Sequence, residues 1–261
     1  MPATAGIILA SGYGAIGDQP KVVVPIGEYP MIIRCIASAL TAGLNPIVIV
    51  VNARYQDEIK SVVRTHFRLK RIRFAVQPER TGAADATLHG LRSMNGRLTD
   101  SFAIIFGDMP LWRPETVGRV MALREQKQAT IAMATVSLEA PHPQEVKRFG
   151  RIIRDGNGLI SRIVEPTDAE PEELKATTVN PSLYAFETDW FFRHARVPEP
   201  HNRGDGYSAE YYLPPLVGLA VSQWLRVAEY PLTDPEEALG VNTPEELARV
   251  RAAWETKRAT P

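Results

Sequence analysis

The sequence predicts an α/β protein with a doubly wound, mixed but mostly parallel sheet, a Rossmann-like arrangement that carries a β-hairpin insertion. Two observations predict this fold class. Short apolar runs suited to buried strands alternate with segments whose apolar residues recur at helical spacing, which is typical of βαβ crossovers. After about residue 138 this alternation gives way to a hairpin signal.

Five apolar runs are predicted to be strands of the sheet: residues 6–10, 47–51, 72–76, 102–106 and 129–136. Helices are predicted between them. The first is bounded by Pro30 and Gly43, and others are predicted over about 55–67, about 82–94 and from 114 onward. In such a sheet, ligands are expected at the carboxyl ends of the strands.

The second part of the chain is predicted to begin with a hairpin. Segments 151–154 and 159–164 flank Asp155-Gly156-Asn157-Gly158, a strong turn sequence. One further strand is predicted over about 178–186.

Two helices are predicted after that strand. The first is short and has Asp189 as its cap. The second lies within 241–261, where Thr243 as N-cap and Glu246 three residues later form a capping box around Pro244.

Composition restricts the possible partners and location. The 261 residues include 30 basic and 30 acidic residues, so no net charge favours nucleic acid or an anionic membrane. The N-terminus lacks the pattern of a signal peptide, and no apolar run approaches the roughly 20 residues that span a bilayer. We therefore expect a soluble, cytoplasmic protein. The single cysteine, Cys35, is predicted to be a buried structural thiol.

A glycine-rich loop follows the first predicted strand. Gly12, Gly14 and Gly17 lie between this strand and Lys21. Glycines allow backbone N–H groups to surround an anion, and a nearby lysine neutralises it. The loop therefore predicts a polyphosphate site, although a tight turn after a strand explains the glycines equally well.

Three polar residues have candidate roles near the ends of predicted elements. Asp108 follows the strand at 102–106, where a carboxylate is suited to Mg²⁺, or simply to capping a turn. Gln77 has both a donor and an acceptor for a nucleobase edge, or belongs to a polar loop. Asn242 precedes the last helix as a turn residue or a metal ligand.

Together these segments resemble the sugar-1-phosphate nucleotidyltransferases. In particular, they are similar to the uridylyltransferase domain of bacterial N-acetylglucosamine-1-phosphate uridylyltransferases, over nearly the whole chain and in the same order. The matching motifs are the glycine loop with Pro20-Lys21, Gln77-x-Glu79-x-x-Gly82, Gly107-Asp108-x-Pro110-Leu111, Phe149-Gly150-Arg151-Ile152, Ile163-Val164-Glu165, Glu210-Tyr211-Tyr212-Leu213 and Gly240-Val241-Asn242.

The resemblance implies one domain over 1–261, with a nucleotide-binding half to about 137, a sugar-binding half over about 138–240 and a C-terminal helix. It implies that nucleotide is bound by Leu9, Ala10, Gly12, Gly14, Gln77 and Gly82. It implies a sugar pocket formed by Gly150, Glu165, Asn180 and Tyr212. Lys21 and Asp108 would be the catalytic residues, and Asp108 and Asn242 would bind Mg²⁺.

The chain departs from the family pattern at the ligand site. Ala15-Ile16 stands where the family has Thr-Arg, and Asp85 stands where it has His. The family's Asn-Thr-Gly in the sugar pocket is Asn180-Pro181-Ser182. Four nearby cations are candidates to replace the missing arginine: Arg80, Lys147, Arg148 and Arg203.

The implied reaction joins an NTP to a sugar 1-phosphate and releases pyrophosphate. The first candidate substrates are UTP and N-acetylglucosamine 1-phosphate. Two alternatives stay open: another nucleotide or acceptor on the same fold, and a non-catalytic nucleotide-sugar-binding protein. No left-handed β-helix repeats follow residue 250, so neither acetyltransferase activity nor trimerisation by that route is expected. The sequence leaves the oligomeric state open.

Overall fold

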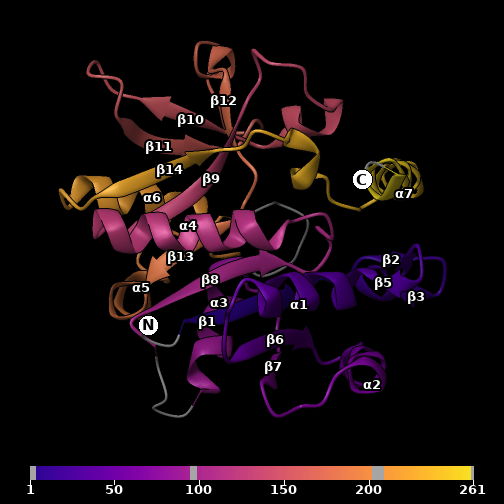
Figure 1. The fold of residues 1–261 in the computed structure, drawn as a ribbon. Helices are drawn as coiled ribbons and strands as arrows, with labels where there is room; N and C mark the ends of the chain where they lie inside the picture. The colour runs from indigo at the N-terminus through magenta and orange to yellow at the C-terminus, as the bar shows by residue number, and fades with distance from the viewer. Residues whose placement is uncertain (1–3, 95–98, 202–208, 260–261) are drawn as a thin grey trace.

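The computed structural model describes residues 4–94, 99–201 and 209–259, and their central feature is a ten-stranded mixed sheet (Figure 1). Its strands are β1 (Ala5–Ala10), β6 (Ile47–Asn52), β7 (Ile72–Gln77), β8 (Ser101–Phe106), β9 (Ile131–Ser137), β10 (Gly150–Arg154), β11 (Ile160–Val164), β12 (Thr178–Asn180), β13 (Tyr184–Glu187) and β14 (Val227–Pro231). They run in the order β11-β10-β12-β9-β13-β8-β1-β6-β7, with β14 paired to β9. Pairs β8–β1, β1–β6, β6–β7 and β14–β9 are parallel, and the others are antiparallel.

Helices cover both faces of this sheet. They are α1 (Met31–Thr41), α2 (Gln56–His66), α3 (Ala83–Arg92), α4 (Pro114–Lys127), α5 (Thr188–His194) and α6 (Pro214–Ser222), whereas α7 (Pro244–Ala259) lies away from the faces of the sheet (Figure 1). Side chains alternate along β1, so Ile8 belongs to the core cluster that contains residues of α1, α2 and α4, while Ile7 belongs to the cluster that contains residues of α3, α5 and α6. Because both faces are buried, the strand is apolar throughout. This confirms the predicted doubly wound class.

Short elements complete the fold around the sheet. They are the hairpins β2 (Ala15–Ile16) with β3 (Gln19–Pro20) and β4 (Pro25–Ile26) with β5 (Tyr29–Pro30), and the 3₁₀ turns η1 (Lys21–Val23), η2 (Gln144–Arg148), η3 (Glu173–Lys175) and η4 (Pro235–Ala238). Helix α7 packs Leu247 and Val250 against Ile26 and Val24. Within the described ranges, no helix is both long and apolar enough to cross a membrane.

The predicted strand over 178–186 was wrong, because the chain forms two strands there. Strand β12 pairs with β9 and β10, whereas β13 pairs with β8 and β9. Ser182, between them, has a φ of +65°, which interrupts the extended backbone.

The ends of two other elements differ from their predicted positions, and the last helix begins at Pro244 as predicted but lacks half of its capping box. Asp189 lies in the first turn of α5, whose N-cap is Glu187, so Asp189 is not the cap. The strand predicted from residue 129 begins at Ile131. In the last helix Thr243 Oγ1 accepts the Glu246 N–H at 3.3 Å, as a capping box requires, but the Glu246 carboxylate accepts from the Asn242 N–H instead of from Thr243.

Candidate active site

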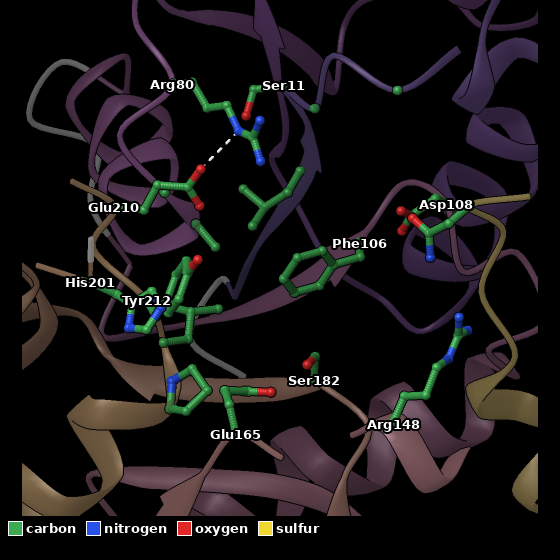
Figure 2. A pocket seen from close by; sticks show the side chains of 18 of the residues that line it. Ser11, Arg80, Phe106, Asp108, Arg148, Glu165, Ser182, His201, Glu210 and Tyr212 are labelled. Carbon is green, nitrogen blue, oxygen red and sulfur yellow. Dashed lines mark ion pairs between the residues drawn. The ribbon is translucent and has the colours of Figure 1, made fainter. Parts of the chain in front are cut away.

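A cavity of about 1270 Å³ lies at the carboxyl ends of β1, β7 and β8 (Figure 2). The glycine loop and the start of α3 line one part of it, and the segments after β11 and before α6 line another. The sequence-predicted residues that line it are Leu9, Ala10, Gly12, Gly14, Lys21, Gln77, Gly82, Asp108, Glu165, Tyr212 and Asn242. Segments distant in sequence therefore meet where a doubly wound sheet is expected to bind ligands.

Lys21, Asp108 and Asn242 form one cluster in this cavity. Lys21 Nζ lies 2.5 Å from Asp108 Oδ2 and donates to Asn242 Oδ1 at 2.6 Å. The backbone brings them together, because the Val241 N–H donates to the Asp108 carbonyl at 3.0 Å. The lysine stem runs over Gly14, where an added Cβ would lie 3.2 Å from Lys21 Cδ. Gly14 therefore leaves room for the lysine.

The oxygens of this cluster fit a magnesium ion. Mg²⁺ is usually held by one or two carboxylates together with water and substrate phosphates. Asp108 supplies a carboxylate and Asn242 an amide oxygen, and both already contact the same cation, the Lys21 ammonium. The described part of the chain contains no group of three or more His, Cys, Asp or Glu side chains suited to a metal. A metal here would thus be completed by water and by oxygens of the ligand.

Asn242 is held in place by Glu246 of α7. The Glu246 carboxylate accepts the Asn242 N–H at 2.6 Å and forms an ion pair with Arg148 of η2 at 2.5 Å. Burial alone would raise the pKa of Glu246, but the hydrogen bonds from Arg148 and Asn242 outweigh it and lower this pKa below its usual value. The carboxylate therefore stays ionised and links the two elements.

The divergent part of the glycine loop folds as a small hairpin. Ala15–Ile16 pairs with Gln19–Pro20, and Gly17 has a φ of +61° at the turn. Ile16 packs against the cluster beneath α7. The residue at the family's arginine position is thus used for apolar packing. Asp18 is exposed and is not among the residues that line the cavity.

Three candidate replacement cations line the cavity, namely Arg80, Lys147 and Arg148. Arg80 Nε lies 2.8 Å from Glu210 Oε1. Figure 2 shows Arg80 on the Glu210 side of the cavity and Arg148 on the Asp108 side. The fourth candidate, Arg203, lies outside the described residues.

Gln77 and Gly82 lie where β7 leads into α3. The side chain of Gln77 is 4% exposed, and its Nε2 donates to the Gly82 carbonyl at 3.0 Å. Gly82 has a φ of +94°, and the backbone of Tyr211 crosses directly above it. The Tyr211 N–H donates to the Thr81 carbonyl, and its carbonyl accepts from the Ala84 N–H. Close backbone packing thus requires glycine at position 82.

Replacing Gly82 with Ala is expected to destabilise the fold by at least roughly 1–3 kcal/mol, because the backbone conformation disfavours a side chain. The added Cβ would also lie 2.4 Å from the Tyr211 carbonyl oxygen. Urea denaturation measures this change. Gly118→Ala is the matched control, since an added Cβ there meets nothing within 4 Å. A Gly82→Ala protein as stable as the wild type would contradict this account.

The predicted sugar-binding residues divide into two groups. Glu165 and Tyr212 line the cavity, and the Tyr212 ring stacks on His201 at 5.2 Å. Gly150 and Asn180 are not among the residues that line the cavity, and their contribution to sugar binding stays a prediction.

Gly150 and Asn180 lie behind the cavity wall. An added Cβ at Gly150 would lie 3.1 Å from Glu165 Oε1, so this glycine leaves room for the Glu165 carboxylate. Asn180 is 1% exposed; it donates to the Tyr184 hydroxyl and accepts the Ser182 N–H at 3.1 Å. Ser182 does line the cavity, so Asn180 supports the wall from behind.

Several lining residues were not among the predicted site residues, and Phe106, Ser182 and His201 are three of them. Phe106 ends an apolar run that predicted only core packing, yet Figure 2 shows its ring facing the cavity. His201 stands in no motif, so no sequence signal pointed to it.

The sequence of this chain matches a known protein family. Residues 6–152 match the model of the MobA-like NTP transferase domain. The chain is 34% identical over 248 residues to the bifunctional protein GlmU of Geobacter metallireducens, covering 94% of this chain and 49% of that protein. It is 31% identical to GlmU of Halalkalibacterium halodurans, covering 97% of this chain and 54% of that protein. The chain thus spans about half the length of these curated relatives.

A solved structure from Bacillus anthracis, in complex with sucrose and bearing the name glucose-1-phosphate thymidylyltransferase, has the same fold. The two structures superpose with a TM-score of 0.69 at 18% sequence identity, covering 96% of this chain and 95% of that one. Since the family model matches more than half of the sequence and the cavity lies at the expected edge of the sheet, the chain belongs to the MobA-like NTP transferase domain family.

Proposed function

We propose that this protein transfers a nucleotidyl group from an NTP to a sugar 1-phosphate and releases pyrophosphate, with Mg²⁺ as cofactor. The observation that carries the proposal is the convergence of Lys21, Asp108 and Asn242 beside the glycine loop. The same cavity extends to Glu165 and Tyr212, so it has room for a second substrate next to the first.

The reaction needs no nucleophilic side chain. A phosphate oxygen of the sugar 1-phosphate forms a bond to the α-phosphorus of the NTP, and the bond from that phosphorus to the oxygen bridging to the β-phosphorus breaks. The protein supplies positioning and charge neutralisation. Lys21 would neutralise the phosphates over the backbone of Gly12 and Gly14, and Glu165 would accept hydrogen bonds from sugar hydroxyls. A Mg²⁺ held by Asp108 and Asn242 would neutralise further phosphate charge.

For substrates we propose UTP and N-acetylglucosamine 1-phosphate, on the basis of the motif resemblance and the GlmU relatives. The test is pyrophosphate release with each of the four NTPs against a panel of hexose and N-acetylhexosamine 1-phosphates. We expect the fastest release with UTP and an N-acetylhexosamine 1-phosphate. Faster release with CTP or GTP would overturn the substrate assignment while preserving the reaction class.

One observation favours a second candidate, a non-catalytic nucleotide-sugar-binding protein. The family's loop arginine is replaced by Ile16, which packs against the cluster beneath α7. Loss of one preorganised donor typically costs about 10²–10³ in rate. Calorimetric binding of UDP-sugars, with no pyrophosphate release from any substrate pair, would favour this candidate over the enzyme.

A further inference from the structure

A buried carboxylate outside the cavity contacts the residue proposed to meet the nucleobase. Asp85, in the first turn of α3, has a side chain that is 1% exposed and is not among the lining residues. Thr81 Oγ1 donates to Asp85 Oδ2, and Arg196, which follows α5, donates to Asp85 Oδ1 through Nε at 2.7 Å and through Nη2. His89 Nε2 lies 3.5 Å from Asp85 Oδ2.

These contacts keep Asp85 ionised. Burial alone would raise the pKa of its carboxyl, but hydrogen bonds from Thr81, Arg196 and Gln77 together lower the pKa below its usual value of 3.8. Asp85 is therefore an acceptor without a proton to donate.

This carboxylate fixes which way the Gln77 amide points. Gln77 Nε2 lies 3.3 Å from Asp85 Oδ2, 3.1 Å from Thr81 Oγ1 and 3.0 Å from the Gly82 carbonyl. A carboxylate and a carbonyl only accept hydrogen bonds, so the amide nitrogen must face them. A flipped amide would bring its oxygen against two other oxygens. Since Gln77 lines the cavity, its oxygen is the polar atom left for a ligand.

We infer that Asp85, supported by Arg196, is a positioning residue that presents Gln77 as a fixed acceptor, so the site selects a pyrimidine with an imide N–H, as in uracil, over cytosine. The inference rests on the proposed function for the place of the nucleobase. Uracil N3 carries a hydrogen that Gln77 Oε1 accepts, whereas cytosine N3 carries a lone pair that would face this oxygen. With cytosine bound, the fixed Gln77 oxygen and the cytosine N3 lone pair would be two acceptors that face each other without a hydrogen between them. Sites that leave a buried polar group unpaired in this way discriminate strongly between ligands.

Calorimetric titration of the full chain with UTP and with CTP, in the presence of Mg²⁺, tests the inference independently of turnover. The wild type is expected to bind UTP at least about 10-fold more tightly than CTP. Asp85→Ala removes one of the two groups that can only accept from Gln77 Nε2, while the Gly82 carbonyl remains, so this ratio is expected to fall by at least about threefold without reaching unity. Asp85→Asn retains an oxygen for Gln77 Nε2 and is expected to keep most of the preference.

Thr81→Val is the second variant, because loss of Asp85 also removes a buried ion pair and lowers stability. Thr81 contacts both Gln77 and Asp85 but does not line the cavity. Its UTP-to-CTP ratio is expected to lie between those of the wild type and Asp85→Ala, and it decides the question if Asp85→Ala does not fold. Asp57→Ala, an exposed position in the first turn of α2, is the control and should keep the wild-type ratio.

The inference is overturned by a wild type that binds CTP as tightly as UTP, by a wild type that binds neither, or by an unchanged UTP-to-CTP ratio in the two loss variants. An equal fall in Asp57→Ala would overturn it as well. Failure of the proposed function gives a different result. The wild type would then select UTP and Asp85→Ala would lose part of this selectivity, but no pyrophosphate would be released. That result preserves the inference and contradicts only the catalytic role.

Discussion

Replacing Asp108 with Ala is expected to lower pyrophosphate release by at least about 10²-fold to 10³-fold. The variant removes the only carboxylate in the Lys21 cluster and one of the two side-chain oxygens that fit Mg²⁺. It also leaves the Lys21 ammonium without its ion-pair partner. Steady-state kinetics with a Mg²⁺ titration would measure the loss, and added Mg²⁺ should not restore the wild-type rate.

Asp189→Ala is the matched control for this variant, because Asp189 is exposed in α5 and is not among the residues that line the cavity. It should retain activity within about twofold of wild type. Thermal unfolding of both variants separates a lost catalytic group from a lost fold. Wild-type activity in Asp108→Ala would refute a role for this carboxylate.

The second large effect is expected from Lys21→Met, which keeps the length of the stem and removes the charge. Turnover should fall by about 10²–10³, since one preorganised cation beside the phosphates is lost. Lys21→Arg should recover part of the rate, because it restores the charge but not the compact ammonium that fits between Asp108 and Asn242.

The control for Lys21→Met is Lys127→Met at the exposed end of α4, which should leave kcat/KM unchanged within about twofold. If Lys21→Met retains the wild-type kcat/KM for the NTP, the phosphates do not lie over the glycine loop in the way we propose.

The central part of the sheet was predictable from the sequence because its strands are buried on both faces. A strand such as β6 has no solvent-facing residue, so it shows as a continuous apolar run. The same property located the ends of the strands, and with them Asp108 and Gln77. The break between β12 and β13 was missed although it is local: the Ser182 N–H donates to Asn180 Oδ1 two residues earlier and Ser182 has a φ of +65°, in a segment whose Asn180-Pro181-Ser182 is typical of a turn.

The motif resemblance named residues without distinguishing those that line the cavity from those behind it. Gly150 lies in a matching motif and Asn180 begins a segment that departs from the family pattern, yet each contacts a lining residue, Glu165 or Ser182. Asp85 stood out in the sequence only as a departure from the family pattern. Its contacts with Arg196 join segments 111 residues apart, and no local spacing encodes them.

The structure explains the residue at position 16 of the hairpin β2–β3, which the sequence alone did not. From the sequence, an isoleucine in a phosphate-binding loop indicates only that the positive charge of the family's arginine is lost. In the structure, Ile16 packs against the apolar cluster formed with α7. Two other cations line the cavity from other elements, each in an ion pair: Arg80 with Glu210 and Arg148 with Glu246.

The account is tested most directly by ³¹P NMR of one reaction mixture containing UTP, N-acetylglucosamine 1-phosphate, Mg²⁺ and the protein. We predict that a nucleotide sugar and pyrophosphate appear in equal amounts and that Asp108→Ala abolishes both. Pyrophosphate absent above the level of the Asp108→Ala sample, with every NTP and sugar 1-phosphate tried, would contradict the proposed catalysis.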